Sequence, residues 1–141
     1  MVVTNQLKNQ HLLWRAGFGP MAEEMHQLAT VSQAAYVKTL FKASERKPVY
    51  IDVADGALKG LLMGLNELSR QKKLNEDERR KLRQQSREEL RSLNLAWLNE
   101  MVNSEAQLRE KMALFWHGHF ASRNPNILYQ QQLLDVIRRN A

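Results

Sequence analysis

The sequence contains no cysteine, and only three of its 141 residues are proline and six are glycine. The absence of cysteine excludes a disulfide scaffold, cysteine-ligated metal sites and thiol catalysis. The low glycine and proline content excludes a collagen-like or low-complexity chain. Because 43% of the residues are hydrophobic, the chain is also too apolar to be wholly disordered. Its length suits one domain with a buried core.

Long hydrophobic runs are absent as well. No segment approaches the roughly 20 apolar residues of a membrane span, and the N-terminus lacks the apolar core of a signal peptide. The sequence therefore predicts a protein that makes no use of a membrane and is cytoplasmic by default. A chain whose export signal had been removed would look the same.

The motifs that identify common enzymes are missing too. The sequence has no glycine-rich phosphate loop, no dinucleotide-binding fingerprint and no serine in a nucleophile elbow. Any catalytic residue and any cofactor are therefore unknown from the sequence.

Helical spacing dominates what is present. Apolar residues recur at steps of three and four, and strand-like alternation is not sustained anywhere. We therefore predict an all-α fold with an extended linker at residues 47–52, where Pro48 disfavours helix. The predicted helices cover residues 6–16, 21–29, 32–42, 54–74, 76–103, 104–122 and 127 onward. Gly17 is expected to end the first helix in the left-handed conformation, and Ser104 and Gln107 match a capping box.

The two central helices are predicted to form an antiparallel hairpin over residues 52–103. The second of them would span roughly 40 Å at about 1.5 Å per residue. Its first half is mostly charged and its second half is apolar, so one end should project from a compact helical core. Residues 1–141 are interpreted as a single helical domain. Six aromatic residues are predicted to be central to its core: Trp14, Phe18, Trp97, Phe115, Trp116 and Phe120.

Two segments resemble signatures of one protein family. Residues 11–20 (HLLWRAGFGP) and 110–121 (EKMALFWHGHFA) are similar, in order and spacing, to signatures of the bacterial domain of unknown function 1800 family. Residues 131–141 are similar to the helix that follows. Members of that family are longer, so the resemblance implies an N-terminal portion of a longer protein; a last helix still running at Ala141 agrees with this expectation. The family has no established activity to carry over.

Two histidines form the most specific candidate site in the sequence. His117 and His119 could bind a metal ion or act in acid–base chemistry. Two residues apart on a helix means about 200° apart, so both rings can face one ion only if the helix ends near Gly118. Capping or hydrogen bonding at the helix end is the structural interpretation, and we favour it.

Arginines supply candidate anion contacts. Arg15 could bind an anion or pair with a carboxylate of the fold. Nucleic acid or another polyanion could contact the hairpin through Arg79, Arg80, Arg83 and Arg87. Aromatic residues for base stacking are absent there and acidic residues are interleaved, so a solvated helix with internal ion pairs is favoured over nucleic-acid binding.

Three hypotheses about function follow. The first is a non-catalytic helical domain that packs against the remainder of its own chain, a protein partner or a second copy. The second is half of an enzyme site that contains His117 or His119 and is completed by residues beyond Ala141. The third is polyanion binding through the basic hairpin.

Overall fold

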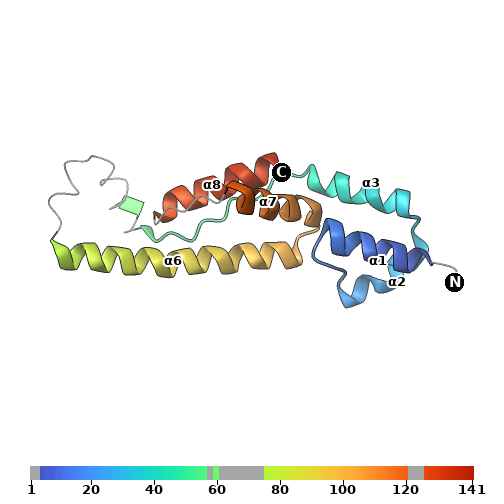
Figure 1. The fold of residues 1–141 in the computed structure, drawn as a ribbon, viewed down its shortest axis with the longest axis horizontal. Helices are drawn as coiled ribbons and strands as arrows, with labels where there is room; N and C mark the ends of the chain where they lie inside the picture. The colour runs from blue at the N-terminus through green and yellow to red at the C-terminus, as the bar shows by residue number, and fades with distance from the viewer. Residues whose placement is uncertain (1–3, 57–58, 61–74, 121–125) are drawn as a thin grey trace.

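The computed structural model describes residues 4–56, 59–60, 75–120 and 126–141. This part of the chain is all-α, as predicted, and contains no strand (Figure 1). No helix within these ranges is long and apolar enough to cross a membrane. The helices, in chain order, are α1 (Asn5–Ala16), the short 3-10 helix η1 (Ala22–Glu24), α2 (Met25–Thr30), α3 (Gln33–Ser44), α6 (Glu76–Asn103), α7 (Gln107–Phe120) and α8 (Ile127–Asn140).

The first three α-helices pack around a small cluster of their own. Leu13 of α1, Leu28 of α2 and Leu40 of α3 form its centre, and none is more than 7% exposed. Asn9 of α1 is fully buried, and its amide donates to Leu28 O (2.9 Å) and Val31 O (2.7 Å). These carbonyls lie at the end of α2 and have no partner within that helix. Asn9 therefore satisfies them and ties α1 to α2.

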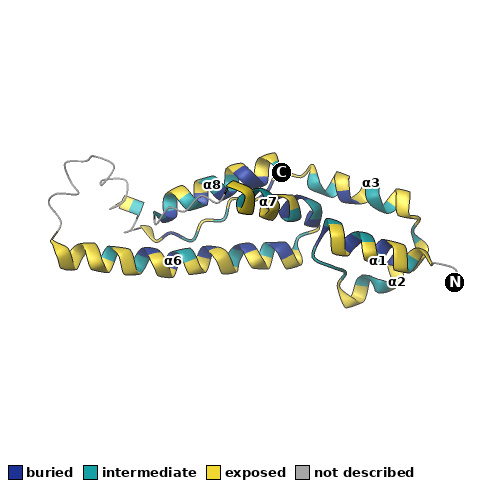
Figure 2. Ribbon diagram, viewed as in Figure 1, coloured by how far each residue is buried: buried dark blue, intermediate teal, exposed yellow. Residues whose placement is uncertain are grey.

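The long helix α6 begins and ends where the sequence predicts. Asn75 Oδ1 accepts from Glu78 N (2.8 Å) and Glu78 Oε2 accepts from Asn75 N (2.9 Å), which completes a capping box. Residues 76–81 are all exposed (Figure 2). Buried residues follow at helical spacing on one side, the inner face: Ser86, Glu89, Leu93, Trp97 and Met101.

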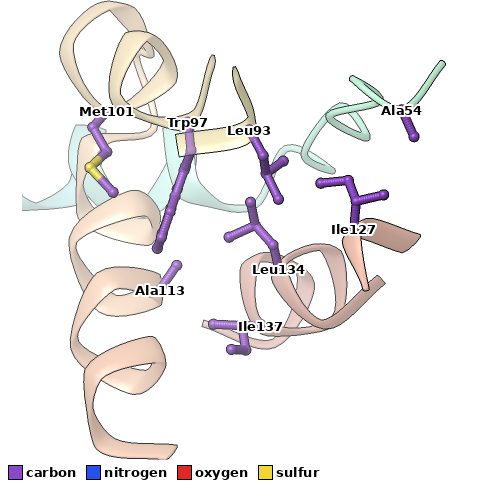
Figure 3. Packing of buried hydrophobic residues seen from close by; sticks show 8 residues of the cluster. All are labelled: Ala54, Leu93, Trp97, Met101, Ala113, Ile127, Leu134 and Ile137. Atoms are coloured by element: carbon purple, nitrogen blue, oxygen red, sulfur yellow. The ribbon is translucent and has the colours of Figure 1, made fainter. Parts of the chain in front are cut away.

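The main core lies where α6, α7 and α8 meet (Figure 3). Trp97 of α6 packs with Ala113 of α7 and Leu134 of α8, and all three are at most 6% exposed. Burial of each large apolar side chain contributes about 1.5–3 kcal/mol. The full set of buried residues in this core is Ala54, Leu93, Trp97, Met101, Ala113, Ile127, Leu134 and Ile137.

The linker after α3 is non-helical, as predicted, and is held against α8 by one buried amide. Gln131 Oε1 accepts from Val53 N and Ala54 N, both at 3.0 Å. Gln131 Nε2 donates to Tyr50 Oη and Asp52 Oδ1, both at 3.2 Å. Gln131 is only 2% exposed, so these bonds supply the linker with the partners that water gives an exposed loop.

A buried ion cluster lies beside the main core. The carboxylate of Glu110 on α7 is 0% exposed and accepts from Arg138 Nε (2.9 Å) and Nη2 (2.9 Å) on α8. It also accepts from Arg109 Nη2 (3.1 Å) and from the indole Nε1 of Trp97 on α6 (3.0 Å). A buried charge is tolerated when it is paired and hydrogen-bonded. This carboxylate therefore joins three helices at one point.

The two arginines of this cluster also hold the linker. Arg138 Nη1 donates to Val49 O (2.7 Å), and Arg109 Nη1 donates to the carbonyl of Arg46. Arg138 Nη2 contacts Glu100 Oε2 of α6 at 3.3 Å. Arg138 and Arg109 are 1% and 6% exposed. Their guanidinium groups therefore donate to the linker carbonyls the hydrogen bonds that water would donate at the surface.

Three of the six aromatic residues predicted for the core lie elsewhere. Trp97 is buried, and Phe18 and Trp116 pack against the edge of the main core. Trp14, Phe115 and Phe120 are 57%, 59% and 61% exposed, so the prediction for these three is wrong. The inward positions of α1 and α7 are taken instead by Asn9, Leu13, Arg109, Glu110 and Ala113.

Local signals were also misassigned at three places. The predicted helix at 21–29 is split into η1 and α2. Gly17 is extended (φ −147°), and the left-handed residue is Gly19 (φ 101°). The Gln107 side chain does not return to Ser104 but accepts from Phe18 N (3.1 Å). The first arm of the predicted hairpin, residues 54–74, lies mostly outside the described residues.

Replacing Glu110 with Gln is expected to lower the free energy of unfolding by about 3 kcal/mol, because two buried arginines lose their counter-charge. Urea denaturation measures this loss. The control is Glu105→Gln, which breaks the Arg46–Glu105 pair, whose side chains are 73% and 74% exposed. That loss should be below about 1 kcal/mol. Equal losses in the two variants would contradict the account.

The same carboxylate makes stability depend on pH. Burial raises the pKa of Glu110, but hydrogen bonds and charge from Arg138, with hydrogen bonds from Trp97 and Arg109, outweigh burial and lower the pKa. Its stabilisation is present above the unfolded pKa of about 4.3 and is lost as the pH falls through the folded value. Below about pH 4, wild type should therefore lose more stability than Glu110→Gln. If wild type and Glu110→Gln lost the same amount of stability as the pH fell, a titratable group other than Glu110 would be responsible for the pH dependence.

Candidate functional site

Aromatic side chains gather at the end of α7. Phe115, Trp116, His119 and Phe120, called here the aromatic cluster, contact one another through their rings. Trp116 is central, with ring centroids 5.1 Å from Phe115, 5.7 Å from His119 and 5.8 Å from Phe120. Trp116 also packs against the main core, while Phe115 and Phe120 are mostly exposed. The rings of Phe115 and Phe120 therefore face solvent while the Trp116 ring beside them packs against the main core.

The two histidines of α7 lie in different environments. His117 is half-buried, and its ring lies 5.3 Å from the ring of Trp97 on α6. His119 is exposed and belongs to the aromatic cluster. The helix continues past Gly118 to Phe120, so the rings leave it about 200° apart.

No three His, Cys, Asp or Glu side chains come together in a metal-binding group within the described ranges. A metal site at His117 and His119 needs further ligands from residues outside those ranges, so it stays a prediction, as does an acid–base role. The ring contacts already explain both histidines as members of aromatic packing.

The basic residues of α6 divide between faces of the helix. Arg80, Arg83 and Arg87 lie three and four residues apart and line one hollow together with Gln84. Arg79 lies about 100° around the helix from Arg80. In the described part of the chain, Arg80, Arg83 and Arg87 form no ion pair. The predicted internal ion pairs are therefore wrong for these three arginines.

Arg15 stands apart from this group. It lies in the last turn of α1 and is exposed. Among the described residues it makes no ion pair, so a role in binding an anion stays a prediction.

The exposed face of α6 continues as an apolar surface beyond the arginines. Leu95, Leu98 and Val102 are 59%, 52% and 57% exposed. The sequence analysis placed Leu98 in the half of this helix that docks in the core, and it did not single out Leu95 or Val102. Their spacing was the available signal, since they fall between the buried positions rather than on them.

The two signature segments, far apart in sequence, meet in space. Phe18 donates its backbone N–H to Gln107 Oε1, next to the second signature, and Lys111 Nζ lies 4.9 Å from the centroid of the Phe18 ring. A Cβ on Gly17 would lie 2.5 Å from Gln107 Oε1. Gly17 is thus needed for close approach rather than for its backbone conformation.

A family model described as protein of unknown function (DUF1800) matches residues 11–141. The chain belongs to this family. The match begins at the first residue of the first signature and spans both signatures, which confirms the resemblance. No curated protein and no solved structure matches the chain. Membership in the DUF1800 family covers both segments that meet at Gly17, Phe18 and α7, and the family description names no activity.

Gly17→Ala is expected to destabilise the protein by about 1–3 kcal/mol, because the new methyl group displaces the buried Gln107 side chain. Gln107→Ala should remove part of this cost in the double variant. The control is Gly118→Ala on α7, where a Cβ meets nothing within 4 Å. That variant should be neutral or more stable by about 0.5–1 kcal/mol. Thermal unfolding measures all four, and equal losses at the two glycines would refute the packing argument.

The geometry of the two histidines gives a second expectation. Because their rings lie on different sides of α7, zinc titration of residues 1–141 should give the same isotherm for wild type, His117→Ala and His119→Ala. Calorimetry measures the isotherm. One-to-one zinc binding that is lost in both variants would show that the two rings share an ion.

Proposed function

We propose that this DUF1800 domain is a helical interaction module that docks through its aromatic cluster and performs no catalysis of its own. The observation that carries the proposal is the exposure of Phe115 and Phe120, at 59% and 61%, although both rings belong to an ordered contact group. Contiguous exposed apolar surface on a soluble protein is typical of an interaction site.

The chemistry of the aromatic cluster suits a protein surface. Aromatic side chains supply large contact areas at a low entropic cost and are enriched at the centres of interfaces. Trp116 packs against the main core and contacts both rings, so ordering Phe115 and Phe120 on binding should cost little entropy. His119 adds a polar group at the rim. These features favour a partner that buries the rings against its own apolar side chains.

The partner we propose first is the remainder of the same chain, since the family resemblance implies longer proteins. A separate protein or a second copy of the chain is the alternative occupant. The polyanion hypothesis for the basic residues of α6 concerns another surface and is tested separately below.

Site-specific photo-crosslinking in the full-length protein distinguishes docking from ordinary exposure. A photoreactive phenylalanine analogue at position 115 or 120 is expected to crosslink in high yield to one continuous surface. The control is the same analogue at Phe41 of α3, which is 61% exposed like Phe120 and lies outside the aromatic cluster. Crosslinking that is no stronger at 115 and 120 than at 41 would contradict the proposal.

Polar replacement of the same rings separates binding from folding. Phe115→Ser with Phe120→Ser should change the free energy of unfolding by less than about 1 kcal/mol, because both rings are mainly in solvent. The double variant should bind a hydrophobic fluorescent dye more weakly than wild type or Phe41→Ser. Large destabilisation with unchanged dye binding would place the rings in the core instead.

A further inference from the structure

The outer face of α6 carries a regular stripe of exposed residues. Arg80, Gln84, Arg87, Arg91, Leu95, Leu98 and Val102 are all exposed (Figure 2). Their spacing is four, three, four, and then four, three, four again. Eleven residues per three turns keeps a stripe nearly parallel to the axis of a helix. The stripe is therefore a straight seam that covers roughly 33 Å.

The seam is basic in its first half and apolar in its second half. Its first half presents Arg80, Arg87 and Arg91, which form no ion pair among the described residues. Its second half presents Leu95, Leu98 and Val102, each more than half exposed. A partner must therefore offer negative charge at one end and apolar side chains at the other.

We propose that the outer face of α6 binds an amphipathic helix that carries carboxylates opposite the arginines and apolar side chains opposite the leucines. Side chains of such a helix recur at the same steps of three and four, so each guanidinium can meet one carboxylate. Arginine suits this pairing because its planar group binds a carboxylate through two parallel hydrogen bonds. Burial of Leu95, Leu98 and Val102 would supply the apolar part of the affinity.

A second copy of the chain does not fit this seam. Parallel pairing of two α6 helices would place arginine against arginine, and antiparallel pairing would place arginine against leucine. Both arrangements leave the guanidinium groups without a carboxylate, and like charges across an interface are costly. The required partner is therefore a different, acidic helix.

A membrane or a nucleic acid fits less well. Helices that lie on a membrane carry their apolar residues along the whole length beside the charges, whereas here the two kinds follow one another. The apolar residues of the basic half, Leu82 and Leu90, pack against the core. Residues 79–91 contain no aromatic ring that could stack on a base.

Binding of synthetic helices tests the proposal directly. The probes are 23-residue peptides with Glu at the four positions that face Arg80, Gln84, Arg87 and Arg91, and Leu at the three that face the apolar half. One peptide runs parallel to α6 and one antiparallel, and fluorescence anisotropy measures their affinity. Binding of either peptide by the wild-type chain is expected.

Charge reversal shows whether the seam is the site. Arg80→Glu, Arg87→Glu and Arg91→Glu together should weaken binding at least about tenfold, and a peptide with Lys in place of Glu should restore it. The control reverses Lys8, Lys38 and Lys42, which are exposed on α1 and α3, so the net charge changes equally. If both triple variants bound the peptide equally weakly, the loss of affinity would come from net charge alone and the proposal would be overturned.

The apolar half and the competing ligands complete the test. Leu98→Ser should weaken peptide binding about tenfold, as expected for the loss of one buried leucine. Failure of both peptides, with binding of duplex DNA, inorganic polyphosphate or anionic lipid vesicles instead, would overturn the proposal. This surface is separate from the aromatic cluster, so either result leaves the docking of Phe115 and Phe120 to its own experiments.

Discussion

One buried carboxylate holds this domain together. Glu110 accepts hydrogen bonds from Arg138, Arg109 and Trp97 in a setting where its own exposure is 0%. An unpaired carboxylate there would cost several kcal/mol, which is a large fraction of the net stability of a typical domain. The structure is consequently stable only when α6, α7 and α8 come together with their polar groups in register. The same arginines bind carbonyls of the linker, so the path of residues 46–49 depends on this cluster as well.

This arrangement decides which surfaces are left for other molecules. The inner face of α6 is taken up by the core, and the seam from Arg80 to Val102 faces solvent. The inward positions of α7 are used by Arg109, Glu110 and Ala113, so the rings of Phe115 and Phe120 lie outside. The burial of the inward side chains of α6 and α7 thus leaves the seam and the aromatic cluster facing solvent. Neither proposed surface requires a catalytic group.

The positions of the helices were the predictable part of the fold. The start of α6 was predictable because its cap, Asn75, and the carboxylates of the first turn are adjacent in sequence and capping is a local interaction. The role of Trp14, Phe115 and Phe120 was not predictable, since hydrophobicity alone cannot tell which side of a helix meets a neighbour. Buried Glu110 and Arg138 were missed for the complementary reason: their burial depends on partners 28 residues apart in sequence. The signature residue Gly17 was identified, but its purpose, space for Gln107, became clear only in three dimensions.

Native-state hydrogen exchange tests the central claim most directly. If the Glu110 cluster joins the three helices, the amides of α7, α8 and residues 93–101 of α6 should exchange slowly and by one common opening reaction. The exposed end of α6, residues 76–81, should exchange by faster local opening. In Glu110→Gln, the protection of all three slow segments should fall together. Separate opening of α8, with α6 and α7 still protected, would contradict the account.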